Sequence, residues 1–99
     1  MPECGDFSYN LISYEEMQGW KRLSAGTITQ AELSRVRTCL KTFPIEPTMV
    51  FERNLTLEAI YTKGSQKFLR FGDLNIAHVD IIVALDEAGR VTGSLTLTQ

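Results

Sequence analysis

The spacing of hydrophobic positions changes near the middle of the chain. Before Pro44 these positions recur at intervals of three and four residues, which is the period of an amphipathic helix. After Pro47 apolar and polar positions alternate, which is the period of a strand. Both prolines belong to the stretch "PIEP", which is typical of a loop that follows a helix. The sequence therefore predicts a helical first half and a β-sheet second half.

A first helix is expected over residues 14–24. Ser13, followed three residues later by Glu16, forms a capping box in which each side chain can bond the other residue's backbone amide. Gly19 lies inside this segment and costs about 1 kcal/mol relative to alanine. The apolar side chains expected on one side of the helix are Met17, Trp20 and Leu23.

A second helix is expected from about Gln30 to Thr42. Thr29 and Glu32 form its capping box, and Gly26 suits the left-handed residue that ends the preceding helix. The apolar positions that would lie on the core are Leu33, Val36, Leu40 and Phe43.

The stretch "GTITQAEL", residues 26–33, carries the Gly and the Glu of positions six and twelve of an EF-hand calcium loop. In that alignment positions one, three and five are Lys21, Leu23 and Ala25. An ammonium group and two alkyl groups cannot coordinate a hard cation, so no calcium site is expected. The chain has one histidine and no cysteine pair at ligand spacing, so no other metal and no cofactor is expected.

Alternating segments after Pro47 predict an antiparallel meander. They are "TMVFER", "LTLEAIYTK", "QKFLRF", "VDIIVALD" and "RVTGSLTLT". Gly64 and Ser65 form a two-residue hairpin turn, which sets Tyr61 opposite Phe68. The second turn is "DEAG", and it is expected to place on one core face the side chains of Ile81, Val83, Leu95 and Leu97.

The predicted fold is α+β, with two consecutive helices packed on one face of an antiparallel sheet of about four to five strands. The element order is strand, helix, helix and then the meander; the first strand, Phe7–Ile12, alternates weakly. We expect a single domain over residues 1–99. Its parts are a loose tail over 1–6, a two-helix segment over 13–43 and a meander over 48–98.

The net charge and the cysteines limit the partners and the cellular compartment that we expect. The formal net charge is −2, which provides no general field for nucleic acid or for an anionic membrane. No segment approaches the roughly 20 apolar residues of a membrane span. The spacing of Cys4 and Cys39 matches no zinc or redox motif, so we expect free thiols and a cytoplasmic protein.

Catalytic candidates are few. His78 is the only histidine, and Asp80 follows two residues later, so the two can share a face of a strand. A histidine beside a carboxylate can act as a general acid or base, although the same pair is also ordinary at the end of a strand. No serine or cysteine nucleophile lies nearby in the sequence, so the balance is against an enzyme.

Basic residues gather on the first predicted hairpin, with Tyr61 and Phe68 among them. Such a surface can bind single-stranded nucleic acid, although the two rings can equally form a cross-strand core pair. The residues that would bind phosphate are Arg53, Lys63, Lys67 and Arg70. The predicted element order is similar to that of small bacterial mRNA-cleaving toxins of toxin–antitoxin systems. That resemblance implies RNA cleavage by Tyr61, Lys67, Arg70 and His78.

The outer face of the last predicted hairpin carries two apolar side chains, Ile82 and Ala84, among polar ones. Its candidate binding residues are Ile82, Ala84, Thr92, Ser94, Thr96 and Thr98. A flat, threonine-rich sheet surface of this kind suits docking of a partner protein or of a second copy of the chain. The alternative is scattered surface apolarity, which is common.

Together these patterns predict a small non-catalytic protein-binding module, such as an adaptor, an inhibitor or an immunity-type protein, that docks through its sheet. The alternative is a small RNA-binding or RNA-cleaving protein that uses the basic hairpin. A third hypothesis is a small-molecule site between helix and sheet, lined by Trp20 and Tyr61.

Overall fold

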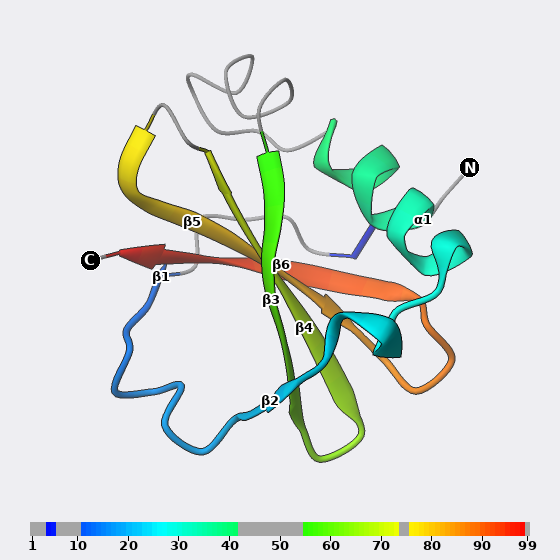
Figure 1. Ribbon diagram of the computed structural model, residues 1–99, viewed down its shortest axis with the longest axis horizontal. Coiled ribbons are helices and arrows are strands. Elements are labelled where there is room, and N and C mark those ends of the chain that lie inside the picture. The colour runs from blue at the N-terminus through cyan, green and yellow to red at the C-terminus, as the bar shows by residue number, and fades with distance from the viewer. Residues whose placement is uncertain (1–3, 6–10, 42–54, 74–75, 99) are drawn as a thin grey trace.

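The computed structural model describes residues 4–5, 11–41, 55–73 and 76–98. Within these ranges a six-stranded sheet is accompanied by one α-helix and one short 3-10 turn (Figure 1). The strands are β1 (Leu11–Ile12), β2 (Lys21–Leu23), β3 (Leu55–Lys63), β4 (Gln66–Asp73), β5 (Ile76–Leu85) and β6 (Val91–Thr98). The helix is α1 (Gln30–Leu40), and the 3-10 turn is η1 (Ala25–Thr27).

The strand order across the sheet is β1-β6-β5-β4-β3-β2. All neighbours pair antiparallel except β1 and β6, which are parallel, so the sheet is mixed. The predicted fold, with two consecutive helices on a purely antiparallel sheet of four to five strands, is therefore wrong. The edge strand β1 lies within the predicted weak strand Phe7–Ile12, of which the structure describes Leu11 and Ile12, whereas the other edge strand, β2, replaces the end of the first predicted helix. The predicted strand "TMVFER" lies outside the described residues.

The helix α1 begins where its capping box predicts. The Thr29 hydroxyl accepts from the Glu32 amide at 3.1 Å, and the Glu32 carboxylate accepts from the Thr29 amide at 3.0 Å. These bonds satisfy two amides that the first turn of a helix otherwise leaves without partners. The buried side chains on its inner face are Val36, Cys39 and Leu40.

The first predicted helix is absent, although the bonds of its capping box form. The Ser13 amide donates to the Glu16 carboxylate at 2.8 Å, but the backbone bonds that follow, such as Trp20 N to Met17 O, span three residues and close single turns. After Gly19 the chain becomes extended and pairs with β3. The hydrogen bonds that β2 forms with β3 are therefore favoured over the local helix signal, which Gly19 weakens. Residues 13–20 connect β1 to β2, the two edges of the sheet (Figure 1), and Met17 and Trp20 pack on one face of it. We call these residues the strap.

The first hairpin has the predicted register from its turn to the middle of its strands. Gly64 adopts the left-handed conformation with φ 62°, and Tyr61 lies opposite Phe68. Farther along, Leu57 rather than Glu58 faces Phe71, because an irregularity between Leu57 and Ala59 inserts one residue into β3.

The second hairpin differs from its predicted register by one residue. Ile82 lies opposite Leu95 and Val83 lies opposite Ser94, because a second irregularity near Ala84 leaves Thr92 without a directly opposed partner. A shift of one residue moves every side chain of a strand to the other face. Leu95 and Leu97 therefore lie on the opposite face from Ile81 and Val83.

The two faces of the sheet carry separate apolar clusters. On the helix face, α1 covers a cluster whose sheet members are Ile60, Leu69, Phe71, Ile81, Val83, Leu85 and Val91. On the strap face, the members are Ile12, Met17, Phe68, Ile82, Ala84 and Leu97, with Trp20, Tyr61 and Leu95 partly buried beside them. A side chain of this size stabilises the fold by roughly 1.5–3 kcal/mol when fully buried.

A disulfide joins Cys4 to Cys39 of α1, with their Cα atoms 5.4 Å apart. It ties a point close to the N-terminus to the inner face of the helix. The prediction of free thiols is therefore wrong. Spacing in the sequence contained no signal for this pair, because the fold brings together residues 35 positions apart. In the described ranges no helix is long and apolar enough to cross a membrane.

Candidate functional site

A groove lies on the strap face, and its floor follows from one row of side chains. Across β3, β4, β5 and β6 the directly paired residues are Tyr61, Phe68, Ala84 and Gly93. Two large rings are thus followed by a methyl group and then by no side chain at all. Because neighbouring strands lie about 4.8 Å apart, this step in side-chain size leaves a hollow above Ala84 and Gly93.

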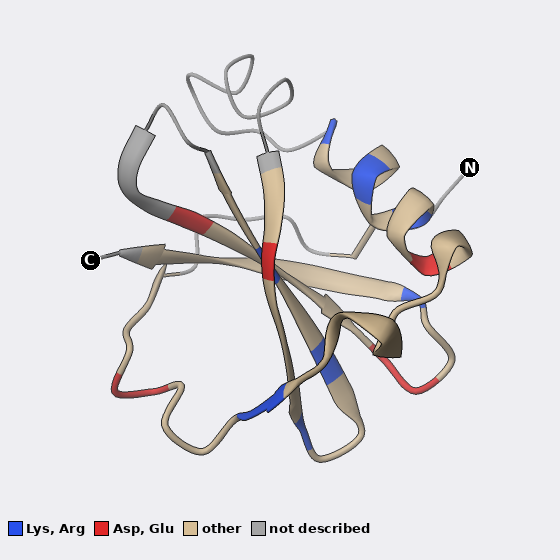
Figure 2. Ribbon diagram, in the orientation of Figure 1, with Lys and Arg blue, Asp and Glu red and all other residues tan. Residues whose placement is uncertain are grey.

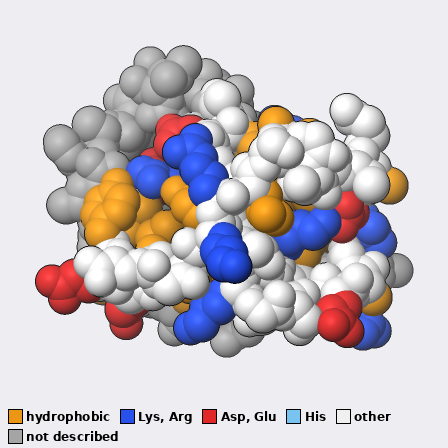
Figure 3. All heavy atoms as spheres, turned by 60° about the horizontal axis from the view of Figure 1, so that its bottom comes forward, with side chains coloured by type: hydrophobic (Ala, Val, Ile, Leu, Met, Phe, Trp, Pro, Cys, Tyr) orange, Lys and Arg blue, Asp and Glu red, His pale blue; other side chains and the backbone are white. Residues whose placement is uncertain are grey.

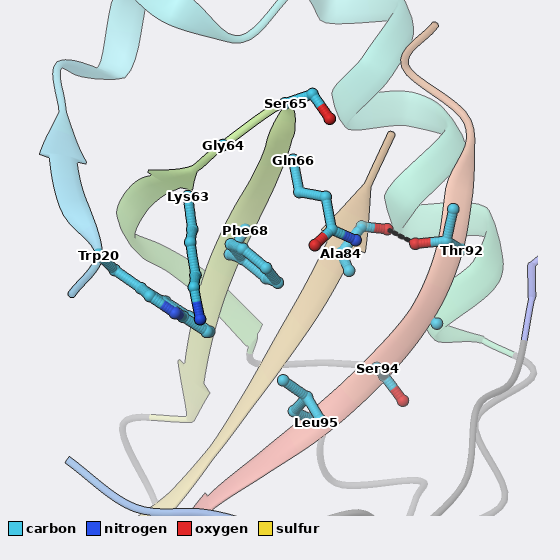
Figure 4. A pocket seen from close by; sticks show the side chains of 11 residues that line it. Trp20, Lys63, Gly64, Ser65, Gln66, Phe68, Ala84, Thr92, Ser94 and Leu95 are labelled. Atoms are coloured by element: carbon cyan, nitrogen blue, oxygen red, sulfur yellow. Dashed lines mark hydrogen bonds between the residues drawn. The ribbon is translucent and has the colours of Figure 1, made fainter. Parts of the chain in front are cut away.

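Aromatic and aliphatic side chains form the walls of the hollow. Trp20, at the end of the strap, stacks on Phe68 with ring centroids 4.0 Å apart and an interplanar angle of 13°. The Tyr61 ring also contacts Trp20, with ring centroids 5.9 Å apart and an interplanar angle of 60°. Leu95 closes the other side (Figure 4). The resulting groove has a volume of about 810 Å³, which is in the range of ligand-binding clefts.

The lining of the groove carries a single charge. Lys63 lies at the hairpin end together with Ser65 and Gln66, and among the described residues no carboxylate lines the groove (Figure 4). Lys63 is exposed, and within the described part of the chain it belongs to no ion pair. A cation beside an apolar hollow favours ligands that combine an apolar group with a negative charge.

A second polar cluster on the strap face is centred on Arg70. Its Nε and one Nη atom both lie 2.6 Å from the Asp80 Oδ2 atom, and the same Nη donates to the Tyr14 hydroxyl at 2.9 Å. Another Nη reaches the Tyr61 hydroxyl at 3.5 Å, and Glu58 lies 3.7 Å away. The guanidinium also lies over the Tyr14 ring at 5.5 Å. This cluster fastens the strap to the middle of the sheet.

Neighbouring carboxylates neutralise the positive charge of Arg70. Burial by itself lowers the pKa of Arg70, but the hydrogen bonds to Tyr61 and Asp80 and the charge of Asp80 outweigh burial and raise it. Gly72 has no side chain to separate the two acids, since a Cβ there would collide with the Glu58 carboxylate. With two carboxylates and two tyrosines around it, Arg70 is a structural cation and has little capacity left for phosphate.

The four residues of the predicted nucleic-acid surface do not form one patch. Lys63 and Arg70 lie on the strap face, whereas Lys67 lies on the helix face, where it donates to the Thr27 carbonyl and pairs with Glu32. Arg53 lies outside the described residues. Of the catalytic candidates, Tyr61 meets Arg70, Lys67 points to the other face, and the side chain of His78 is not described.

The predicted docking residues are also divided between the two faces. Ile82 is fully buried and Ala84 is 8% exposed, both on the strap face. Ser94 and Thr96 are buried on the helix face, and their hydroxyls have no hydrogen-bond partner in the described part. Thr92 is exposed and donates to the Ala84 carbonyl at 3.3 Å, and the side chain of Thr98 is not described. Of the six residues, Ala84, Thr92 and Ser94 line the groove, although the Ser94 hydroxyl points away from it (Figure 4).

The residues that build the groove were only partly visible in the sequence. Trp20 and Tyr61 were expected to line a site, but Gly93, Lys63 and Leu95 were not. A pattern that could have found them is the row of decreasing side-chain size, which becomes readable only when the register of both hairpins is known. No group of His, Cys, Asp and Glu residues that could hold a metal ion occurs among the described residues.

Comparison of the chain with protein-family models, with curated proteins and with solved structures gave no match.

Proposed function

We propose that this protein is a small non-catalytic binding module that docks a partner protein through the groove on the strap face. The observation that carries the proposal is the open hollow of about 810 Å³ over Ala84 and Gly93, walled by the stacked pair Trp20 and Phe68. Tryptophan and similar rigid anchors with apolar neighbours are common at protein-binding sites. Docking at this groove replaces docking at the six residues expected from sequence, because those residues do not share a face.

Two further features support binding over catalysis or RNA binding. Arg70, which holds an ion-pair network on this face, is neutralised by Asp80 and Glu58. Lys67, which both RNA hypotheses require, is on the opposite face. RNA binding by the basic hairpin is therefore the less supported alternative.

The compartment is part of the same proposal. Disulfides persist in oxidising environments and are rare in the cytoplasm. The Cys4–Cys39 bond therefore favours a protein that works in an oxidising compartment over the cytoplasmic location expected from the sequence.

The test is affinity capture with wild-type protein and with Ala84→Phe, which fills the hollow. Lys21→Gln is the matched control, since Lys21 is exposed on β2 and does not line the groove. We expect a near-stoichiometric partner on the wild type and on Lys21→Gln, and its loss from Ala84→Phe. Thermal unfolding of each variant establishes that the fold is intact.

Retention of the same partner by Ala84→Phe would contradict the proposal, as would recovery of RNA without protein. Light scattering on the purified protein distinguishes a different partner from a second copy of the chain. Self-association through the groove would double the mass of the wild type and not that of Ala84→Phe.

A further inference from the structure

We infer that the groove recognises an acidic segment of the partner, in which an apolar side chain lies next to a carboxylate. This inference rests on the proposed function, because it names the chemistry of what the groove binds. The apolar side chain enters the hollow over Ala84 and Gly93, and the carboxylate pairs with Lys63.

The balance of charge within the groove supports a negative ligand. Among the described residues that line the groove, Lys63 is the one ionised side chain. The other cations of the first hairpin, Lys67 and Arg70, already pair with Glu32 and with Asp80. Lys63 is therefore the cation of the hairpin that remains available to an approaching carboxylate.

The surroundings of the groove strengthen the positive field. Arg22 of β2 is exposed, pairs with Tyr61 and so shares the strap face with Lys63. Lys21, in contrast, pairs with Thr62 and lies on the other face. Arg22 takes part in no ion pair within the described ranges. Figure 2 shows the basic stretch of β2 close to the end of the β3–β4 hairpin in projection, and Figure 3 shows Lys and Arg side chains beside hydrophobic ones on the side that carries this end. Arg22 therefore adds positive charge at the edge of the face that carries Lys63.

The shape of the hollow requires the apolar half of the ligand. Its floor offers only a methyl group and a glycine backbone, and its walls are Trp20, Phe68 and Leu95. The Thr92 hydroxyl is already engaged with the Ala84 carbonyl. A purely ionic ligand would leave this apolar surface exposed to water and gain one exposed ion pair, which strengthens binding by about fivefold at most.

The test uses a library of random heptapeptides displayed on phage and selected on the wild-type protein. We expect enriched sequences with a large apolar residue within two positions of Asp or Glu. The best peptide is then synthesised twice, once as selected and once with Asn or Gln in place of the acid. Binding is followed through the fluorescence of Trp20, the only tryptophan in the chain.

Substitutions at Lys63 measure the ionic contribution. Removing the acid from the peptide, or changing Lys63→Gln, should each weaken binding about fivefold, and combining them should cost little more. Lys63→Glu should reverse the preference between acidic and neutral peptides. Lys21→Gln, which alters a cation outside the lining, should leave the ratio between the two peptides almost unchanged.

The outcomes separate the inference from the function on which it rests. Enriched peptides that Ala84→Phe no longer binds, but that lack acids or ignore Lys63→Glu, would overturn the acidic-segment inference and leave the binding groove standing. If no peptide is enriched, or if Ala84→Phe binds every enriched peptide as wild type does, the inference fails together with the groove as the docking site.

Discussion

The two faces of this sheet are built from the same strands but are covered in different ways. The helix face is covered by α1, which presents an apolar side chain at each turn, and its central side chains are fully buried. The strap face is crossed by eight residues without regular secondary structure, of which Met17 and Trp20 supply the apolar cover. A strap with two anchors covers part of a sheet face and leaves the rest available as a groove.

The two faces also differ in the interactions that hold their covering segments in place. The helix face is held mainly by apolar packing and a disulfide, with one ion pair between Lys67 and Glu32 at its rim, whereas the strap is fastened by a charged network around Arg70. A network of this kind determines where a segment lies, because each hydrogen bond has a required direction. The Arg70 cluster therefore sets the position of the strap, and the position of the strap sets the edge of the groove.

The largest difference is expected from matched phenylalanine substitutions. Phe71→Ala removes a fully buried ring from the helix face and should lower the free energy of unfolding by about 4 kcal/mol. Phe68→Ala removes a ring that borders the groove, where water can fill the vacated space, and should cost clearly less. Urea unfolding of both variants provides the measurement, and equal losses would contradict the comparison.

The next largest effect is expected at Arg70. Arg70→Ala leaves Asp80 buried without its partner and should lower the free energy of unfolding by about 3 kcal/mol. Arg90→Ala is the control, because Arg90 pairs with Asp86 at 3.1 Å but its side chain is 69% exposed, so the loss should stay below about 1 kcal/mol. Similar losses from the two variants would show that the Arg70 network does not hold the strap.

A smaller effect is expected at the cap of α1. The hydrogen bond from the Thr29 amide, reinforced by the Thr29 hydroxyl bond and by Lys67, lowers the pKa of Glu32 below its ordinary 4.5. A lowered folded-state pKa means that the carboxylate stabilises the fold above pH 4.5 and that this contribution is lost as the pH falls through the lowered pKa. Glu32→Gln should therefore cost about 1 kcal/mol at pH 7, and the cost should shrink in acid.

Thermal unfolding between pH 7 and pH 3 checks this prediction. Glu87→Gln is the control, because Glu87 is exposed in the β5–β6 turn and should alter stability little at any pH. A cost for Glu32→Gln that did not change with pH would mean that the charge of Glu32 plays no part in the cap.

The smallest effect on stability is expected inside the groove. Ala84→Leu adds three carbons to a hollow that has room for them, so the free energy of unfolding should change by less than about 0.5 kcal/mol. Ser94→Leu instead enlarges a side chain that is buried on the helix face, and it should cost about 1–3 kcal/mol through overpacking. Comparable costs at the two sites would indicate that the groove is closed in solution.

Local signals in the sequence predicted local structure well. The capping box of Thr29 and Glu32 marked the start of α1, and Gly64 with Ser65 marked the first hairpin and most of its register. The signals failed where distant segments decided the outcome. Lys21–Leu23 became a strand because β3 had an edge to pair with, and the parallel partner of β6 came from the opposite end of the chain.

The candidate site depended on the least predictable features. One inserted residue near Thr92 moved Leu95 and Leu97 to the strap face. The alternation of apolar and polar residues in the sequence does not indicate where such a bulge occurs. Without that shift the row from Tyr61 to Gly93 does not exist, and the hollow cannot be recognised. Trp20 was expected beside Tyr61, but its partner Phe68 could be named only once the strap was known to replace a helix.

The most direct test of the binding groove is an NMR titration of ¹⁵N-labelled protein with the peptide selected by display. The single indole N–H of Trp20 provides an isolated signal on the wall of the groove, and Gly93 reports from its floor. We predict that these two signals shift together and saturate, while the amides of Val36 and Cys39 beneath α1 stay in place. Shifts confined to α1, or spread evenly over both faces, would contradict docking at the strap face.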